Sequence, residues 1–419
     1  MLNAHGRNIA IVTGPGKLHL FEAARVLADA GWNVRVVTGW LPEAKRLAWL
    51  DPVGRLMGQP NLRQRIAGRR LQLQGVGHLE QCLFAECGHQ ALGLLGRAGV
   101  LSEDWAGALG FTLFGSAAAG KLGSPHLVHV RSGAGQGGAI RKARRLGARI
   151  VVDHSIAHPD AIAKALGPEF ERYGLKCPIN GQSGFWKVVL RDCNEADAVL
   201  VNSEYVKTTF LDHGFPCGKL AVAYLGVRRD FIGAKKRYER RGPLKLLFTG
   251  HFDLRKGVRT LLDACEILKR HGAEFQLQVV GFVGNGRYAL RGRTLGDQVR
   301  FVDFVPQDVL RHYLANADIF VFPTFAEGSS RSAMEAMGAG LPVITTRACG
   351  VPIEDGVNGV YVDPGNAGQL ADMIQRLAGN EELRRELGSN ACATISGHYS
   401  WTSYAGAVSR LYETLLRHY

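Results

Sequence analysis

The sequence predicts an α/β protein with two Rossmann-like domains, each a doubly wound parallel sheet, which face each other across a cleft. Three observations favour this fold class. The chain has 419 residues, so two domains of about 200 residues each are expected in place of one core. Short β-branched runs alternate with amphipathic stretches along the chain, which indicates parallel strands joined by helices. The 53 glycines suit the tight turns that such sheets require.

Two series of strands divide the chain into domains. The first domain is expected over residues 1–232, with strands at 8–13, 33–37, 126–130, 149–153, 198–202 and 220–224. The second is expected over 245–399, with strands at 245–249, 276–280, 300–304, 319–322 and 343–345. Residues 233–244 are polar and basic and are predicted as a linker, and 400–419 as a helix that packs back toward the first domain. Because ligands of such sheets bind at the carboxyl ends of the strands, the cleft is expected there.

Composition narrows the functional classes. The net charge of +14 gathers at 45–70, 141–149 and 235–241, which is compatible with a solvated surface, an anionic membrane or an anionic substrate. A nucleic-acid partner is disfavoured because no nucleic-acid motif accompanies the charge. The eight cysteines form no CxxC pair, no secretory signal is expected, and the uncharged stretch 105–120 is too broken by glycines to span a bilayer. We therefore expect a cytoplasmic protein, with peripheral association at the inner face of a membrane left open.

The most specific segment is PTFAEGSSRSAMEAMGAGLPVITT, residues 323–346. Glu327 lies in a loop after a strand, and Glu335 lies eight positions later on the following helix. The N-terminus of that helix, at Ser329 and Ser330, offers unpaired N–H groups and a positive dipole, which suit a diphosphate. Either acid alone is typical of an exposed residue, but together they are expected to contact two parts of one ligand.

This segment, E-G-x6-E-A-M-x-x-G-x-P-V-I, resembles the signature of the retaining glycosyltransferase family 4 (group 1), whose fold is GT-B. The resemblance also covers 196–231, 246–268 and 301–323, and is weakest over 39–125. It implies a nucleoside-diphosphate sugar as donor, bound mainly by the second domain. It further implies that Glu335 binds the ribose and that Glu327 lies beside the sugar and the reacting face.

No cluster of residues with metal-ligand spacing is visible, so no metal cofactor is expected. Positively charged side chains of the protein are therefore expected to contact the donor phosphates. Lys256, at the start of a helix, is the first candidate. The resembled family usually has an arginine directly after the strand glycine, where this chain has His251, so Arg255 is expected to supply the missing charge. The donor site is also expected to include Gly281 and Val305, the latter in the segment whose family counterpart borders the base.

Two groups near the amino end are further candidates. The turn TGPGKLH follows the first strand, and Gly14 and Gly16 would let the backbone approach a ligand, although a simple tight turn is an equal alternative. Lys17 in this turn is an additional cation. In VVDHSIAHP, the resemblance places one histidine near the transferred sugar; His158 fits this role better and His154 is the alternative.

A competing motif lies at Gly133–Gly138, a literal G-x-G-x-x-G that follows a strand, with Asp153 twenty residues after its first glycine. It would suit an NAD-dependent oxidoreductase. The motif does not lie at the first strand-to-helix turn, and that class would not explain Glu327, Glu335 and Lys256 together. Two further classes stay open: a sugar-nucleotide epimerase of the same fold, and a non-catalytic protein that binds a sugar nucleotide or a membrane.

The favoured hypothesis is a metal-independent, retaining hexosyltransferase of polysaccharide or glycolipid biosynthesis. Its partners would be a nucleoside-diphosphate sugar and a saccharide or lipid-linked acceptor, with no nucleic acid. Residues 41–73 carry seven basic and two acidic residues among leucines and Trp49, which is compatible with a surface helix on an anionic membrane. An ordinary basic insertion is an equal alternative.

Overall fold

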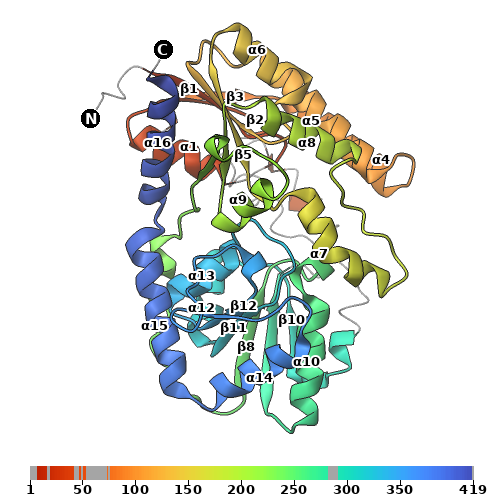
Figure 1. Cartoon of the computed structure of the whole chain (residues 1–419), viewed down its shortest axis with the longest axis vertical. Helices are drawn as coiled ribbons and strands as arrows, with labels where there is room; N and C mark the ends of the chain where they lie inside the picture. The colour runs from red at the N-terminus through yellow and green to blue at the C-terminus, as the bar shows by residue number, and fades with distance from the viewer. Residues whose placement is uncertain are drawn as a thin grey trace.

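In the computed structural model, residues 7–16, 19–41, 47–48, 51–52, 73, 76–281 and 291–417 are described. The chain forms two α/β domains, one above the other in Figure 1, each built on a parallel sheet. The predicted fold class is therefore confirmed. Lys17 and most of the basic segment 41–73 lie outside the described residues, so the structure carries no information on them.

The N-terminal sheet has seven strands in the order β3-β2-β1-β4-β5-β6-β7, and all its pairings are parallel. The strands are β1 (Asn8–Val12), β2 (Asn33–Thr38), β3 (His78–Gln81), β4 (Leu127–Arg131), β5 (Arg149–His154), β6 (Ala198–Val201) and β7 (Leu220–Val222). The five positions of β1 read Asn-Ile-Ala-Ile-Val, and all but the first are buried, as expected for a central strand with helices on both faces.

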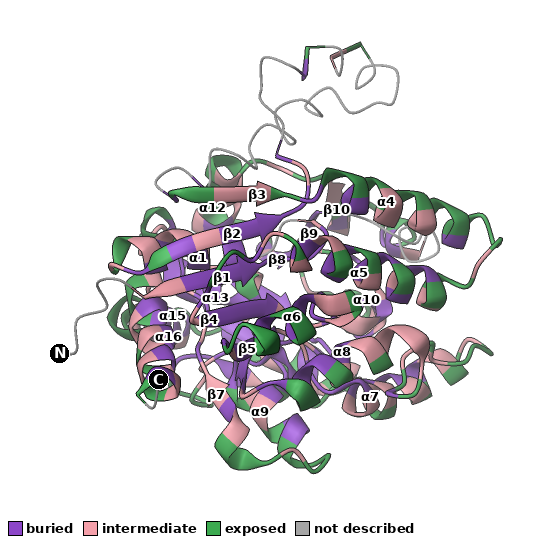
Figure 2. Ribbon diagram, turned by 90° about the horizontal axis from the view of Figure 1, so that it is seen from above, coloured by how far each residue is buried: buried purple, intermediate pink, exposed green. Residues whose placement is uncertain are grey.

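Helices cover both faces of this sheet (Figure 2). The helices of the domain are α1 (Leu20–Asp29), α4 (Leu83–Arg97), α5 (Glu103–Ala119), α6 (Ala139–Arg145), α7 (Pro159–Glu171), α8 (Gly184–Glu195) and α9 (Glu204–Leu211). One core packs Ile9 and Ile11 of β1 against α1, and the other packs Ala10 and Val12 against α5 and α6. The alternation of β1 side chains between the two cores is the period-2 geometry of a strand.

The C-terminal sheet has six strands in the order β10-β9-β8-β11-β12-β13. Its strands are β8 (Leu244–Thr249), β9 (Phe275–Val280), β10 (Val299–Val302), β11 (Ile319–Phe322), β12 (Val343–Thr345) and β13 (Val360–Tyr361). Its helices are α10 (Val258–Arg270), α12 (Gln307–Asn316), α13 (Arg331–Ala339), α14 (Ala367–Ala378) and α15 (Glu381–His398). The reversal of order between β8 and β11 leaves a crevice at the carboxyl ends of these strands.

The last helix, α16 (Trp401–Leu416), returns to the N-terminal domain and packs beside α1 (Figure 1). The indole of Trp32 donates a hydrogen bond to the Ser409 hydroxyl at 2.8 Å and meets the Tyr412 ring edge-on. The chain thus crosses between the domains twice. No described helix is long and apolar enough to cross a membrane.

The basic segment between the domains differs from a solvated linker in one respect. Gly233 and Lys235 donate backbone N–H groups to the carbonyls of Gly338 and Ala339, and the Lys235 ammonium is buried and donates to the Ala317 carbonyl. Burial lowers the pKa of Lys235 to about 8. Lys235 therefore belongs to the packing of the C-terminal domain and is not part of a charged surface.

Candidate active site

A cleft of about 670 Å³ lies between the two domains, at the carboxyl ends of both sheets. Its lining residues lie at the ends of, or after, β1, β5, β6 and β7 in one domain and β8, β9, β10 and β11 in the other. They are His19, Ser155, Asn202, Leu225, Thr249, Gly250, His251, Arg255, Lys256, Val280, Gly281, Phe304, Val305, Gln307, Leu310, Glu327, Ser329, Ser330, Arg331, Ser332 and Glu335.

The loop after β8 places two cations in this cleft. The Asp253 carboxylate accepts the backbone N–H of Lys256 at 3.1 Å, which caps the short 3-10 turn Leu254–Lys256. Gly257 then joins this turn to α10 with a left-handed φ of 73°. A Cβ atom at this position would lie 1.8 Å from the Pro323 carbonyl oxygen, so only glycine allows the turn to lie against the end of β11.

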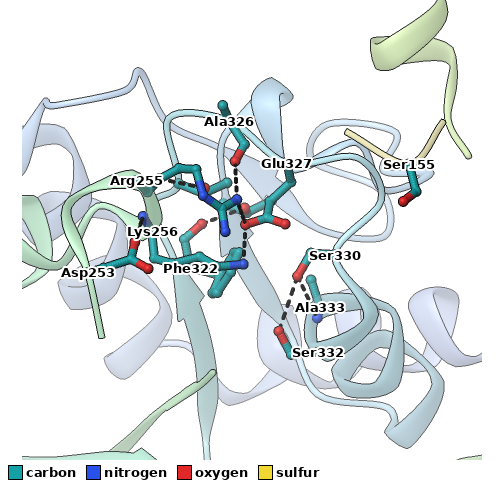
Figure 3. A network of polar contacts seen from close by, with 12 residues as sticks. Ser155, Asp253, Arg255, Lys256, Phe322, Ala326, Glu327, Ser330, Ser332 and Ala333 are labelled. Carbon is teal, nitrogen blue, oxygen red and sulfur yellow. Dashed lines mark hydrogen bonds and ion pairs between the residues drawn. The ribbon is translucent and has the colours of Figure 1, made fainter. Parts of the chain in front are cut away.

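The two cations converge on Glu327 (Figure 3). Arg255 Nη1 donates to Glu327 Oε1 at 2.7 Å and to the Ala326 carbonyl at 2.8 Å, and Lys256 Nζ contacts the same carboxylate oxygen. The Lys256 ammonium also lies 5.0 Å from the centre of the Phe322 ring. These side chains are largely buried, so the charges interact more strongly than they would at an open surface.

The helix that follows presents its N-terminus to the cleft. The Ser330 hydroxyl accepts the N–H of Ala333 and lies 3.1 Å from the Ser332 hydroxyl. Glu335 is on the first turns of this helix, where burial raises its pKa while Arg331 and Arg228 lower it. The helix N-terminus and the two cations together make this wall of the cleft suited to an anion.

The loop that carries Glu327 also contacts the opposite domain. The Ser203 hydroxyl donates to the Gly328 carbonyl, and a Cβ at Gly328 would lie 2.0 Å from the Ser155 carbonyl oxygen. The close approach of Ser155 to this loop is visible in Figure 3. Residue 328 must therefore be glycine for the two domains to meet at this point.

The structure brings most of the predicted site residues together. Those that line the cleft are Glu327, His251, Arg255, Lys256, Gly281, Val305, Ser329, Ser330 and Glu335. Gly14, Gly16 and His158, which are also described, are not among the lining residues. The roles that the sequence suggests for these three residues stay predictions.

His158 is held on the side of the N-terminal domain. Its ring stacks on His213 at 4.1 Å and meets Phe210 and Phe215 edge-on, while Nδ1 accepts the N–H of Asp160 at the start of α7. Burial, followed by His213, lowers the pKa of His158 to about 4. The position is that of a helix-capping core residue, so the geometry does not support a contact with the transferred sugar.

The alternative histidine, His154, is also buried. Its Nδ1 lies 3.0 Å from the Ser132 hydroxyl, and its ring packs against Phe210. Burial lowers the pKa of His154 to about 4. Of the two histidines that the sequence suggested, neither lines the cleft, although their neighbour Ser155 does.

The turn after β1 is fixed by a hydrogen bond from Arg131. Gly14 and Gly16 both have positive φ, and the Pro15 carbonyl between them accepts a hydrogen bond from Arg131 Nη1 at 3.0 Å. The Arg131 guanidinium stacks over the Phe111 ring at 4.9 Å. This geometry agrees with a tight turn that positions the start of α1.

In the competing glycine motif, Gly133–Gly138, the backbone N–H groups are already bonded to the Asp192 side chain. The N–H groups of Gly133 and Gly135 donate to Asp192 Oδ2 at 2.7 and 2.8 Å, and Gln136 Nε2 donates to Oδ1 at 2.7 Å. Asp192 is fully buried. An internal carboxylate therefore occupies the place where a dinucleotide-binding loop of this type would receive a pyrophosphate.

His19 is a cleft residue that the sequence analysis did not single out. It lies at the start of α1, lines the cleft, and contacts the buried Asp153. A histidine that opens a helix directly after a glycine turn was the available signal. The sequence analysis considered Asp153 as the acidic residue of the competing glycine motif, whereas the structure places it in a buried contact with His19.

Comparison with known proteins agrees with this geometry. Residues 243–380 match the family Glycosyl transferases group 1. The amylovoran biosynthesis glycosyltransferase AmsK of Erwinia amylovora is 32% identical over 179 residues, which cover 40% of this chain and 44% of that protein. The chain thus spans less than half the length of this curated relative.

Solved structures resemble the whole chain. Anabaena HepE in complex with UDP and glucose superposes with a TM-score of 0.62 at 18% identity, covering 97% of this chain and all of that one. Sucrose-phosphate synthase from Thermosynechococcus elongatus gives a TM-score of 0.65 at 19% identity, with 99% and 100% coverage. At this identity the likeness concerns the fold. The two facing parallel sheets are those of the GT-B fold, and the second domain, over residues 243–380, matches the group 1 glycosyltransferases.

Proposed function

We propose that the chain transfers a hexose or related sugar from a nucleoside-diphosphate sugar to a saccharide or lipid-linked acceptor, in the synthesis of a cell-surface polysaccharide or glycolipid. The observation that carries the proposal is the convergence of Arg255, Lys256, Glu327 and Glu335 in one interdomain cleft. Related proteins are named for polysaccharide synthesis, as AmsK is for amylovoran. The donor class is supported by the likeness to HepE, whose structure holds UDP and glucose.

Each of these residues has a distinct role in the proposal. Arg255 and Lys256 stabilise the negative charge that develops on the departing diphosphate, with the N-terminus of α13 as a further positive group. Glu335 binds the ribose, and Glu327 positions the sugar. The cations perform the role that a divalent ion has in other transferases, so the reaction proceeds without metal.

The stereochemical course is proposed to be retention, as in family 4. The transition state has oxocarbenium character, and the acceptor attacks on the face from which the diphosphate departs. In this route no protein base is required, so Glu327 and the α13 N-terminus act by charge and position. Closure of the two domains over the cleft would exclude water and limit hydrolysis of the donor.

The first experiment is thermal stabilisation of the purified protein by UDP, GDP, ADP and NAD, each with EDTA. A shift with one nucleoside diphosphate, abolished in Lys256→Ala and Glu335→Ala, is expected and identifies the donor base. Gln298→Ala, on a turn away from the cleft, is the matched control. A shift with NAD alone would overturn the proposed donor class. A shift that requires a divalent ion would overturn the proposed metal independence.

The product then distinguishes transfer from epimerisation. With the matching nucleotide sugar, a glycosyltransferase forms an acceptor glycoside, whereas an epimerase changes the sugar without any acceptor. NMR coupling constants at the anomeric carbon of the product test retention directly. An inverted product would refute the retaining course and leave the transferase proposal intact.

An anionic membrane is proposed as the surface at which a lipid-linked acceptor is reached. Eight of the 14 exposed large apolar residues of the described chain lie on α4, α5 and their connection, including Phe84, Trp105 and Leu109. Exposed basic residues follow on the neighbouring α6, among them Arg141 and Arg145. An apolar patch of this kind beside basic side chains suits insertion at a lipid headgroup region of negative charge.

Vesicle binding tests this surface. We expect sedimentation with vesicles containing phosphatidylglycerol, reduced in a Phe84→Ser, Trp105→Ser variant and in an Arg141→Gln, Arg145→Gln variant. Leu175→Ser, also exposed but on another part of the domain, is the control. Equal binding of all variants, or dimerisation through the apolar patch in solution, would refute the membrane proposal.

A further inference from the structure

The cleft contains a histidine that is bound to a buried carboxylate. His19 lines the cleft on the N-terminal side, and its Nε2 lies 3.0 Å from Asp153 Oδ2. Although His19 is the first residue before α1, its side chain does not cap that helix. The ring is therefore oriented by Asp153 and not by the helix that it precedes.

Asp153 is the centre of a larger buried network. His129 Nε2 lies 3.4 Å from the same carboxylate oxygen, and His129 Nδ1 lies 2.5 Å from the hydroxyl of Tyr412. Burial raises the pKa of the Asp153 carboxyl, but His19 and His129 outweigh it and hold the pKa well below its usual range. Asp153 is thus a carboxylate, and a chain of polar contacts runs from α16 to the cleft.

An ionised carboxylate determines which ring nitrogen of His19 carries the proton. Asp153 accepts hydrogen bonds only, so in its neutral form the His19 imidazole donates from Nε2. Nδ1 of that form keeps its lone pair, has no hydrogen-bond partner among the described residues, and is the ring nitrogen left for a ligand. The same arrangement of a carboxylate behind an imidazole fixes tautomer and orientation in hydrolytic triads.

We propose that His19 accepts a hydrogen bond from a substrate hydroxyl in the cleft, and that Asp153 is the positioning residue that keeps His19 in the required tautomer. The inference rests on the proposed transfer reaction, because the sugar of the donor and a saccharide acceptor both carry hydroxyl groups and His19 lines the cleft proposed to bind them. His129 and Tyr412 complete the network, so the return of α16 to the N-terminal domain supports the site as well as the fold.

Two substitutions of His19 separate the two edges of the ring. In His19→Gln, the terminal amide can still donate to Asp153 at the position of Nε2, but no acceptor remains at the position of Nδ1. In His19→Asn, a polar atom remains near Nδ1 and the contact with Asp153 is lost. We expect nucleoside-diphosphate binding to stay within about twofold of wild type in both, and kcat/KM to fall by about tenfold or more in His19→Gln, with partial recovery in His19→Asn.

Whether the hydroxyl that His19 binds belongs to the donor sugar or to the acceptor follows from which constant changes, the affinity for the nucleotide sugar or the acceptor KM. If it belongs to the donor sugar, His19→Gln weakens binding of the nucleotide sugar but not of the nucleoside diphosphate. If it belongs to the acceptor, the acceptor KM rises and donor binding is unchanged. Unchanged turnover in His19→Gln, or a loss of nucleoside-diphosphate binding as large as the loss of turnover, would overturn the proposal.

Asp153→Asn tests the positioning role. Its amide can present an N–H to His19 Nε2, which moves the proton to Nδ1 and converts the acceptor into a donor. We expect turnover to fall as in His19→Gln, with no further fall in the double variant and with nucleoside-diphosphate binding retained. Additive losses in the double variant would refute the coupling. A wild-type protein that transfers no sugar would instead refute the proposed function.

Discussion

Gly257→Ala tests how far the conformation of the loop that carries Arg255 and Lys256 depends on glycine. An L-residue in the left-handed region costs about 1 kcal/mol relative to glycine. Gly272 provides a matched control, because it follows the other end of α10 with a φ of 70° and a Cβ there would have no atom within 4 Å. Gly272→Ala should therefore lose about 1 kcal/mol, or about 2–4 °C in Tm.

The same substitution at Gly257 adds a steric contact. The Cβ would lie 1.8 Å from the Pro323 carbonyl oxygen, which is a backbone atom and cannot be relieved by a side-chain rotation. Overpacking of this kind costs about 1–3 kcal/mol, so the total loss should be about 2–4 kcal/mol. Relief requires the loop to move away from Pro323 and takes Lys256 and Glu327 apart, so nucleoside-diphosphate affinity should fall as well.

Urea unfolding and calorimetric titration with the nucleoside diphosphate check both parts. We expect Gly272→Ala to bind the nucleotide as wild type does and Gly257→Ala to bind it at least about tenfold more weakly. Equal destabilisation of the two variants would refute the steric reasoning. Wild-type affinity in Gly257→Ala would show that the position of Lys256 does not depend on this turn.

Three other perturbations follow from the charges of the molecule. Glu327→Gln leaves Arg255 and Lys256 without their carboxylate, so the ligand-free protein should lose about 3 kcal/mol of stability. A nucleoside diphosphate should bind the variant more tightly than wild type in a calorimetric titration. Weaker binding would contradict this reasoning. His154 has a folded pKa of about 4 against about 6.5 unfolded, so it binds fewer protons when folded and lowers the stability by about 2 kcal/mol on going from pH 7 to pH 5. His158 has the same lowered pKa, so His154→Gln should reduce this pH dependence in urea titrations by about half and leave the part due to His158. Asp192→Asn replaces a hydrogen-bond acceptor by an N–H donor and should lower the stability to thermal unfolding by about 1–3 kcal/mol, without creating NAD binding. A Tm shift caused by NAD, in wild type or in the variant, would count against the proposed transferase function.

The sequence predicted the two sheets because their central strands are buried on both faces and read as apolar runs. β3, His-Leu-Glu-Gln, has no such run, since it is a half-exposed edge strand, and it was not predicted. The helix α5 was missed for a different reason. Its glycines and alanines make it apolar around most of its circumference, so no helical period marks one face.

The site was predictable where its residues are close in sequence. Glu327, Ser330 and Glu335 lie in one loop and helix, and the Arg255–Lys256 turn is a single local unit. The pair of His19 and Asp153 joins residues 134 positions apart, and only the adjacency of β1, β4 and β5 brings them together. The surroundings of His158 were not predictable for the same reason, because the aromatic rings that enclose it come from α9 and the segment after it.

Two loops of the chain that present groups suited to an anion show what decides between a structural turn and a candidate site. In both, a carboxylate of the protein meets the loop: Asp192 at Gly133–Gly138, and Glu327 at Arg255 and Lys256. Asp192 is fully buried, so its replacement by a ligand would require the domain to open. Glu327 lines the cleft and is partly exposed, so a diphosphate can compete for the same cations without unfolding anything. The spacing of the first loop matches a known motif more fully, but a ligand can reach the positive groups of the second loop, and for this reason we propose the second loop as the functional one.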